Sequence, residues 1–371
     1  MKLLIEKNIL LESLTNVMRA ISPRNIIPIL NGVMFNLTDE GLYLTASDSD
    51  LTIRNFIPKE QIKNIVETGK IIIQSKYLLE IIRKLPNTDI NIEVLDGLKI
   101  IISTENTVYN LNCLDTEDYP NITLDEVEKP IVINSDIFKK IINQTLFAVS
   151  TQESRPLLTG INFKINGNIM ECVATDSYRL AKKTINLEKS YESYNIVIPG
   201  KNINELDKLL SDDEKLEIHL FDNKVLFKYK NYLFQSSLLN GTYPNTNNFI
   251  PENFEIIMTT SLNDYYAAVD RAALLSQNKD KNIIKMDTSD NEIIITSSST
   301  EIGKSEEKVL INKNNDKNIS ISFSSQYMLD ALKTFEDEEL IILLNNDSKP
   351  IILKSVKDES LIQLILPIKT Y

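Results

Sequence analysis

The chain of 371 residues carries one pattern three times, about 125 residues apart, and this repetition restricts its fold more than any single motif does. Three segments begin with a strand-like residue and continue as an amphipathic run: Ile73–Glu80, Ile198–Glu205 and Phe323–Asp330. Ser75, Gly200 and Ser325 hold the same place in these segments, at intervals of 125 residues. The tripeptide Tyr-Pro-Asn at 119–121 recurs at 243–245. We therefore predict three copies of one domain.

The expected domains are 1–125, 126–250 and 251–371, because polar linkers with prolines occupy residues 115–128 and 240–253. Each domain is expected to contain two strand–helix–strands units, which gives an α+β fold with helices on one side of antiparallel sheet. The first helices are expected at 9–21, 136–149 and 262–275, and the second helices after Ser75, Gly200 and Ser325. Strands are expected at 32–37, 42–46, 160–165, 169–174, 283–286 and 292–297, and a hairpin at 91–103.

The charge balance is acidic, with 40 Lys and Arg against 52 Asp and Glu and a net charge of −12. Taken alone, this argues against nucleic-acid binding, which depends on contacts to phosphates. Two cysteines, Cys113 and Cys172, are too few for a disulfide framework or a zinc site. The charged start Met1–Lys7 lacks the apolar run of a signal peptide, and no apolar stretch approaches the ~20 residues of a membrane span. We expect a cytoplasmic protein without a cofactor or a membrane partner.

Basic residues recur in register on the second helix of each repeat. Lys76 and Arg83 are seven residues apart and so lie on one helix face, with Leu78, Leu79, Ile82 and Leu85 opposite. Lys201 and Lys208 hold the same positions in the second repeat, and Gln326 and Lys333 in the third. A second basic position follows each first helix, at Arg24, Arg155 and the pair Lys279 and Lys281. Either these are ordinary solvated helix faces, or they form a positive lining that holds a polyanion without reading its sequence.

No catalytic constellation emerges from the sequence. The single histidine, His219, lies in an alternating strand segment, which favours a structural role, and nine glycines form no phosphate-cradling loop. Asp48 and Asp50 suggest metal ligands, but Asp48 is in register with Asp176 after a strand, which favours a turn-capping role. An uncharacterised hydrolase would need a catalytic set that the sequence does not offer.

Four segments carry a resemblance to a known family: Arg24 with Pro28-Ile29-Leu30, Val173–Ala181, Tyr243-Pro244 and Leu364–Tyr371. Over its whole length the chain resembles the bacterial DNA sliding clamp, the beta subunit of DNA polymerase III. The resemblance implies a half-ring of three clamp domains, which closes head to tail with a second chain into a six-domain ring around duplex DNA. Two chains would supply about twelve helices, which at ~9 Å spacing leave a hole of about 24 Å. The implied function is that of a processivity factor without catalysis.

The resemblance also implies partners and sites. The partners are double-stranded DNA bound without sequence specificity, a second copy of the chain, the alpha subunit of DNA polymerase III, the clamp loader and other replication and repair proteins at the nucleoid. Partner proteins would insert a short apolar motif into a pocket between the second and third domains. Its implied residues are Leu158, Thr175, Tyr178, Arg179, Leu180, Pro244, Phe249, Ile365, Leu366, Pro367 and Ile368. The implied DNA contacts are Arg24, Lys76, Arg83, Gln152, Arg155, Lys201, Lys208 and Lys281.

For the ring joint, the resemblance points to Tyr109 and Leu111 facing Leu274 and Leu275, which would otherwise be core residues. The chain departs from the family at Lys369, where many members carry arginine, and at Asn248, where some do. It also has Pro156 and Leu157 at two positions that are aromatic in some members. A second hypothesis remains open beside the ring. A monomeric scaffold of three repeats would bind proteins through the pocket around Leu180 and Leu366 and never encircle DNA.

Overall fold

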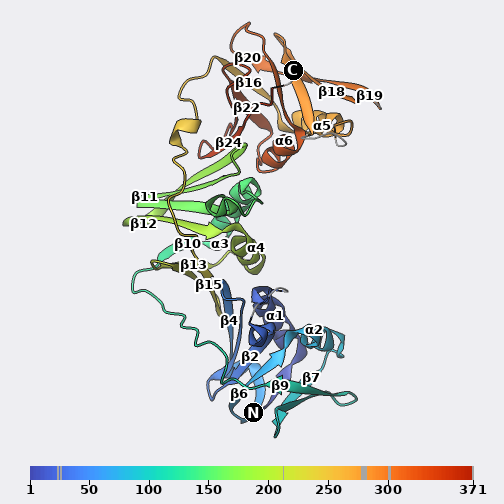
Figure 1. Ribbon diagram of the computed structural model, residues 1–371, viewed down its shortest axis with the longest axis vertical. Coiled ribbons are helices and arrows are strands. Elements are labelled where there is room, and N and C mark those ends of the chain that lie inside the picture. Colours follow the sequence, from blue (N-terminus) through green and yellow to red (C-terminus); the bar gives the residue numbers. More distant parts are fainter. Residues whose placement is uncertain (23–24, 26, 212, 277–281, 300–301, 370–371) are drawn as a thin grey trace. The chain divides into compact units, whose positions relative to one another are not determined.

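The computed structural model describes residues 1–22, 25, 27–211, 213–276, 282–299 and 302–369 (Figure 1). The chain divides into two compact units. The N-terminal unit contains residues 1–138 and 204–238, and the C-terminal unit contains residues 139–203 and 239–371. The central repeat thus contributes to both units, because its two sheets join different neighbours. None of the described helices is long and apolar enough to cross a membrane.

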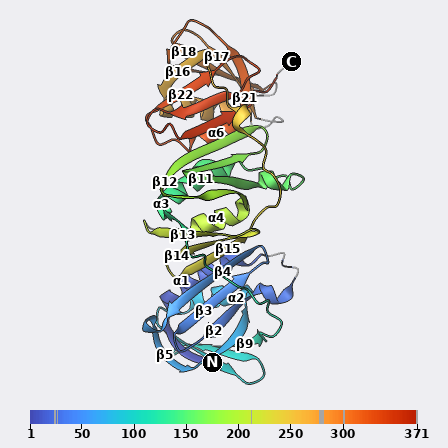
Figure 2. The same cartoon turned by 90° about the vertical axis from the view of Figure 1, so that its left-hand side faces the viewer.

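The N-terminal unit is built on a 13-stranded antiparallel sheet with the order β10-β13-β14-β15-β4-β3-β2-β6-β9-β8-β7-β1-β5. Figure 2 shows part of this sheet, in which β15 lies beside β4. The first repeat contributes β1 (Lys2–Glu6), β2 (Gly32–Leu37), β3 (Gly41–Ser47), β4 (Leu51–Pro58), β5 (Ile62–Glu67), β6 (Gly69–Gln74), β7 (Asp89–Leu95), β8 (Lys99–Ser103) and β9 (Val108–Leu114). The central repeat contributes β10 (Ile131–Asn134), β13 (Lys215–Leu220), β14 (Lys224–Tyr229) and β15 (Tyr232–Ser237). The helices of the first repeat are α1 (Lys7–Val17) and α2 (Ser75–Lys84).

The C-terminal unit holds a seven-stranded sheet, β11-β12-β24-β23-β22-β16-β20, and a four-stranded sheet, β19-β18-β17-β21. The central repeat supplies β11 (Gly160–Thr175) and β12 (Arg179–Pro199). The third repeat supplies β16 (Ile256–Ser261), β17 (Ile283–Thr288), β18 (Glu292–Ser299), β19 (Gly303–Leu310), β20 (Asn312–Lys313), β21 (Ser320–Ser324), β22 (Glu339–Leu344), β23 (Ile351–Ser355) and β24 (Leu361–Ile365). The remaining helices of the chain's described part are α3 (Ser135–Thr145), α4 (Gly200–Leu209), α5 (Leu262–Ala273) and α6 (Ser325–Leu332), with short 3-10 turns at 18–20, 28–31, 59–61, 146–148, 156–159 and 247–249.

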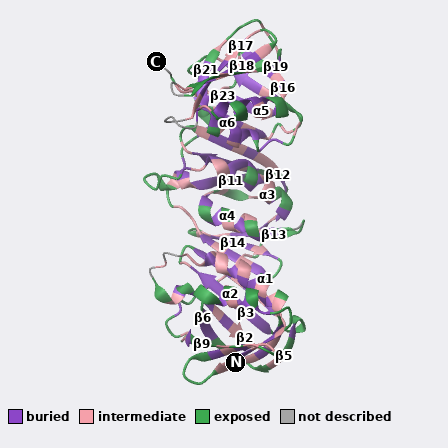
Figure 3. Cartoon of the chain, turned by 90° about the vertical axis from the view of Figure 1, so that its right-hand side faces the viewer, coloured by how far each residue is buried: buried purple, intermediate pink, exposed green. Residues whose placement is uncertain are grey.

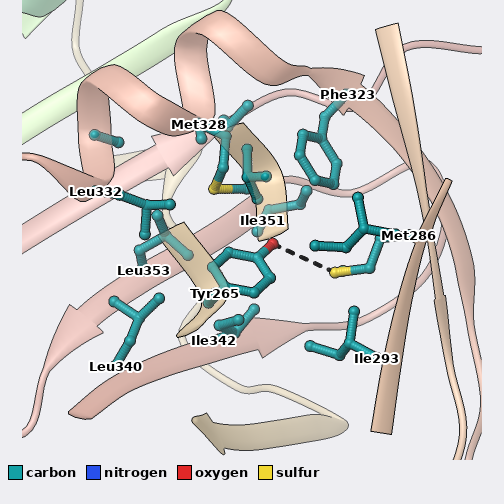
Figure 4. Packing of buried hydrophobic residues seen from close by; sticks show 14 of the residues in the cluster. Tyr265, Met286, Ile293, Phe323, Met328, Leu332, Leu340, Ile342, Ile351 and Leu353 are labelled. Carbon is teal, nitrogen blue, oxygen red and sulfur yellow. Dashed lines mark hydrogen bonds between the residues drawn. The ribbon is translucent and has the colours of Figure 1, made fainter. Parts of the chain in front are cut away.

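The core of the third repeat lies between its two sheets and around α5 and α6 (Figure 4). Tyr265 of α5 is fully buried there, and its hydroxyl meets the sulfur of Met286 at 3.5 Å. Both helices begin at a serine cap: Ser261 Oγ accepts from the backbone N–H of Asp264, and Ser324 Oγ accepts from that of Tyr327. Apolar residues of both helices then face the strands of this repeat, as the prediction of helices packed on antiparallel sheet requires.

Helix ends differ from the prediction in one consistent way. The first helices of the repeats end at Val17, Thr145 and Ala273 rather than at 21, 149 and 275. In the first two repeats the apolar pattern continues through a tighter 3-10 turn, at 18–20 and 146–148, so a 3.6-residue period alone overestimates the helix. The strands expected at 160–165 and 169–174 are one strand, β11, interrupted by register shifts on both sides of Gly167, whose φ is 61°.

The predicted turn at Asp48 and Asp176 is confirmed. Asp48 Oδ1 accepts from the backbone N–H groups of Asp50 and Leu51, at 3.1 and 2.8 Å. Asp176 Oδ1 accepts in the same way from Tyr178 and Arg179, at 2.9 and 3.0 Å. The residues between, Ser49 and Ser177, share a φ of 79°, so both carboxylates hold a left-handed turn. The sequence spacing of 128 residues therefore links two structurally equivalent turns.

Candidate functional sites

The basic residues predicted in register on the second helices are exposed to solvent. We call this set the basic column: Lys76 and Arg83, Lys201 and Lys208, and Lys333. Lys76 and Arg83 on α2 are exposed, as are Lys201 and Lys208 on α4. Figure 3 shows exposed segments of the ribbon at α2. Of the apolar residues expected on the opposite side, Leu79 is half-buried and the others are buried: Leu78, Ile82 and Leu85; Ile203, Leu206 and Leu210; Met328, Leu329, Leu332 and Phe335. In the third repeat Lys333 follows the last residue of α6 and is exposed together with Gln326. The column is thus a solvent-facing feature of every second helix.

In the first two repeats an acidic residue lies three positions before the second basic residue of the column and pairs with it. The sequence analysis missed this acidic residue. Arg83 pairs with Glu80 at 2.7 Å, and Lys208 pairs with Glu205 at 2.6 Å, each within one helical turn. The third acid in this register, Asp330, pairs instead with Arg179 at 2.7 Å. The Arg83–Glu80 pair is exposed and therefore weak, so a phosphate can replace this carboxylate with little loss of free energy. Glu205 is only 25% exposed and also pairs with Arg19 at 3.5 Å. The recurrence of the acid at the same 125-residue interval was the signal in the sequence.

The expected DNA contacts in the loops after the first helices lie only partly within the described residues. Arg24 and Lys281, with Lys279, lie outside the described residues. Arg155 is exposed, and its Nη1 donates to Ser177 Oγ at 3.0 Å. Gln152 is also exposed, and its backbone N–H donates to Ser150 Oγ. Arg155 is therefore held beside the turn of Asp176 with much of its guanidinium still open to solvent.

The expected pocket residues gather around one apolar cluster of the C-terminal unit. Leu158 and Leu180 are buried with Tyr243, a residue from the linker, and with three residues of the third repeat, Leu343, Ile352 and Leu364. Thr175 is also buried, and its Oγ1 donates to the backbone carbonyl of Arg179. Three large apolar side chains of the expected set are exposed instead: Tyr178 at 58%, Phe249 at 48% and Leu366 at 37%. The Leu366 N–H donates to the Tyr178 carbonyl, so these two residues adjoin. Pro244 is exposed, and Pro367 and Ile368 are half-buried.

The structure corrects the assignment of Ile365 to the partner-peptide pocket. Its side chain is fully buried in the core of the third repeat, among residues such as Met328 and Ile351. The preceding residue, Leu364, faces the cluster of Leu158 and Leu180. Successive side chains of a strand point to opposite faces, so β24 cannot present both residues to one surface. Leu364, Leu343 and Ile352 are the residues that the sequence analysis missed, and the alternation within 361–366 was the available signal.

Arg179 is more constrained than a residue at a pocket rim. Its Nε donates to Asp176 Oδ2 at 3.0 Å and its Nη1 to Asp330 Oδ2 at 2.7 Å. Its guanidinium carbon lies 4.4 Å from the ring centroid of Tyr327 and 5.3 Å from that of Phe147. Two carboxylates and two rings therefore fix this side chain, which ties β12 to α6.

The expected ring-joint residues lie on strand β9 of the first repeat and directly after helix α5 of the third repeat. Tyr109 and Leu111 of β9 are half-buried. Their strand pairs with β8 from Val108 to Asn112, but with β6 only through Cys113 and Leu114. Leu274 follows α5 and is 63% exposed, which argues against the core alternative, and Leu275 is half-buried. Strand β19, at the edge of the four-stranded sheet, lies next to α5 and carries Glu307, which pairs with Arg271 at 2.6 Å.

Comparisons with known proteins agree with this organisation. Models of the DNA polymerase III beta subunit match the chain in order: the N-terminal domain over residues 1–123, the central domain over 132–245 and the C-terminal domain over 247–369. The chain belongs to the DNA polymerase III beta subunit family. The beta sliding clamp of Bacillus subtilis (strain 168) is 41% identical over 378 residues, and the match covers all of both chains. The three predicted clamp domains are thereby confirmed.

Solved structures extend the agreement to the fold. The crystal structure of the DNA polymerase sliding clamp from Bacillus subtilis covers all of both chains with a TM-score of 0.96 at 40% identity. That of the DNA polymerase III beta chain from Streptococcus pneumoniae also covers all of both, with a TM-score of 0.96 at 32% identity. The function of the chain is accordingly that of a sliding clamp, a processivity factor in DNA replication, with DNA and a polymerase as its general partners.

The acidic cluster around His219 fits a structural role better than a metal site. Glu126, Glu217 and His219 offer ligand atoms within 4.8 Å of one another. His219 Nδ1, however, accepts from the backbone N–H of Val127 at 3.0 Å, so its proton resides on Nε2, which faces Glu217 at 3.5 Å. Lys228 already supplies a cation to Glu126 at 2.7 Å. His219 thus anchors the linker at Val127 to strand β13.

Proposed function

We propose that two copies of the chain close head to tail into a ring around duplex DNA and serve as the accessory subunit of DNA polymerase III. The observation that carries this proposal is a rule of pairing between successive repeats. Strand β4 of the first repeat pairs with β15 of the second, with Ile53 opposite Phe234. Strand β12 of the second repeat pairs with β24 of the third, with Ala181 opposite Gln363.

The same rule predicts the joint between two chains. Strand β19 is the counterpart of β4 and β12, and it is a sheet edge, while β9 is the counterpart of β15 and β24. When the hairpin registers of the three repeats are superposed, Ser305 corresponds to Ile53 and Tyr109 to Phe234. We therefore propose an antiparallel pair between β19 of one chain and β9 of its partner, with Ser305 opposite Tyr109. An exposed edge strand favours such pairing, and a closed ring leaves no edge.

Side-chain directions support this register. Tyr109 and Leu111 lie opposite Ile102 and Ile100, which are fully buried, so they point to the helix side of their sheet. Ser305 bonds Ser297, whose hydroxyl donates to the carbonyl of Ala272 in α5. Tyr109 of one chain would thus meet Leu274 and Leu275 of the other at the end of α5.

A disulfide cross-link tests the joint. The proposed register places Asn110 opposite Lys304 on the outer face of the sheet, and both residues are exposed. Opposed residues in antiparallel strands have a Cα separation that a disulfide can bridge. The variant with Asn110→Cys and Lys304→Cys should form a covalent dimer under mild oxidation. Lys308→Cys in place of Lys304→Cys is the matched control, because it lies four residues further along the same face, ~13 Å away.

Background from the native thiols is small. Cys113 and Cys172 are buried, and burial raises the pKa of Cys113 to about 11, so little thiolate forms at neutral pH. Light scattering of the unmodified chain should give a mass near twice 42.3 kDa. A monomeric mass at micromolar concentration, together with equal cross-linking in the control, would favour the scaffold of three repeats instead.

We further propose the placement of DNA and of protein partners. The basic residues Lys76, Arg83, Lys201, Lys208 and Arg155, with Arg24, Lys281 and Gln152, would contact the DNA backbone inside the ring. The cluster of Leu158, Leu180 and Leu364, with the exposed Tyr178 and Leu366, would receive an apolar motif from the polymerase alpha subunit, the clamp loader or repair proteins. The domains would be bounded at 125 and 250, and the protein would act in the cytoplasm at the nucleoid.

A further inference from the structure

A cavity of about 500 Å³ lies in the N-terminal unit, on the outer face of β2, β3, β4 and β6. Its floor is formed by Met34, Asn36, Tyr43, Thr45, Arg54 and Lys70. The linker at 119–122 forms its wall, with Tyr119 and Ile122. Val33 and Phe35 alternate with the floor residues and are fully buried on the helix side, so this cavity faces away from α1 and α2. It belongs to none of the sites described above.

Two polar groups at the cavity, the Tyr119 hydroxyl and the Arg54 guanidinium, lack a hydrogen-bond acceptor or a carboxylate partner among the described residues. Tyr119 is 9% exposed, and no described residue bonds its hydroxyl. Burial raises the pKa of Tyr119 to about 12, so the hydroxyl remains a donor at neutral pH. Arg54 donates through Nε to Thr45 Oγ1 at 3.1 Å, and within the described part of the chain no carboxylate pairs with its guanidinium. Buried groups of this kind are costly unless a partner satisfies them.

The second repeat shows how the same position is neutralised within the chain. Arg54 lies opposite Thr45, and Lys182 lies opposite Val173, each in the register that a shift of 128 residues predicts. Tyr43 on the first repeat corresponds to Glu171 on the second. Glu171 forms an ion pair with Lys182. In the first repeat an uncharged tyrosine replaces that carboxylate, and the positive charge of Arg54 faces the cavity instead.

We propose that this cavity binds an oxyanion, a carboxylate or a phosphate, carried by a small aromatic or apolar group. Arg54 would bind the anion through its free guanidinium N–H groups, and the Tyr119 hydroxyl would donate a further hydrogen bond. Lys70, which is exposed at the cavity, adds a second positive charge. Met34, Ile122 and the rings of Tyr43 and Tyr119 supply the apolar surface. A volume of about 500 Å³ is in the range of small-molecule sites.

Titration with three small probes tests the proposal on the full chain. Benzoate and phenyl phosphate supply the anion, and benzamide is the neutral probe of similar shape. Saturation-transfer NMR and isothermal titration should detect both anions, with affinities on the order of 1 mM or better, and should detect benzamide at least about tenfold more weakly. Tighter binding of phenyl phosphate would identify a phosphorylated ligand, and tighter binding of benzoate a carboxylate.

Three variants locate the site. Arg54→Gln should weaken both anions at least about tenfold. Tyr43→Glu should have the same effect, because it rebuilds the internal ion pair of the second repeat without emptying the cavity. Lys182→Gln removes the corresponding charge of the second repeat and should leave anion binding unchanged. Equal affinities for benzoate and benzamide, or undiminished anion binding in Arg54→Gln, would overturn the proposal. Neither result bears on the cross-link between chains, because the cavity contains no residue of the proposed joint.

Discussion

Arg179 and Asp330 form an ion pair with 2.7 Å between Nη1 and Oδ2, which joins strand β12 of the central repeat to helix α6 of the third. Both side chains are largely buried, at 13% and 23% exposed. Asp330→Asn should therefore destabilise the C-terminal unit by about 1–3 kcal/mol, because the guanidinium loses a charged partner in a site with little water. Urea unfolding followed by tyrosine fluorescence measures the change.

The matched control for this pair is Glu336→Gln. Glu336 pairs with Lys140 at the same 2.7 Å, but the two side chains are 71% and 40% exposed. Solvent screens that pair, so its loss should cost less than about 1 kcal/mol. Equal losses in both variants would mean that burial does not strengthen the Arg179 contact.

Adjacent residues of β24 should separate stability from partner binding. Ile365→Ala removes a fully buried side chain of the core and should cost about 2–5 kcal/mol of unfolding free energy. Leu366→Ser changes a side chain that is 37% exposed, so stability should change little while affinity for an apolar partner peptide falls at least about tenfold. Fluorescence anisotropy with a labelled peptide from the polymerase alpha subunit measures affinity. If Ile365→Ala weakened the peptide as much as Leu366→Ser, the assignment of faces on β24 would be wrong.

Local chemistry made much of the fold predictable. The Asp48 and Asp176 turns follow from a carboxylate that bonds the N–H groups two and three residues ahead, a preference contained within four residues. The basic columns follow from a seven-residue spacing on a helix, and all of their apolar opposites except the half-buried Leu79 are buried as expected. The family resemblance then supplied the ring and the peptide site, which no local pattern contains.

Long-range pairing was not predictable in the same way. Nothing near Ile53 in the sequence indicates that it lies opposite Phe234, because that register is fixed by hairpins far apart in the chain. The orientation of Ile365 was misassigned because five consecutive apolar residues, Leu364–Ile368, give no polar mark of which strand face each one occupies. The unpaired charge of Arg54 emerges only when its cross-strand neighbours are known, because the decisive difference is Tyr43 in place of Glu171.

Charge reversal on the exposed helix column should weaken DNA association. The double variant Arg83→Glu and Lys208→Glu replaces two exposed cations without touching the buried faces of α2 and α4. If both contact phosphates, the slope of log affinity against log salt should fall by roughly 2. Loading onto nicked circular DNA, followed by gel filtration at several salt concentrations, measures retention. The control is Lys99→Glu with Lys164→Glu, two exposed lysines on strands β8 and β11, and equal losses there would show a general charge effect rather than a contact.

His219 should make the docking of the linker depend on pH. Burial lowers the pKa of His219, although Glu126 and Glu217 oppose the shift, and Nδ1 accepts the Val127 N–H only while the ring is neutral. The unfolded chain takes up this proton near pH 6.5, before the folded chain does. Stability is therefore complete above about pH 6.5 and is lost as the pH falls toward the lower folded pKa.

Since His219 is the only histidine, its ring signals in a carbon-proton NMR spectrum report this titration without assignment. We expect a midpoint below 6.5 in the folded protein, a further decrease in Glu217→Gln, and broadening of the Val127 amide over the same pH range. In His219→Phe the ring cannot accept the Val127 N–H or take up a proton, so the decline in stability over this pH interval should vanish. A midpoint at or above 6.5 would mean that the carboxylates outweigh burial, and the pH dependence would then have the opposite sign.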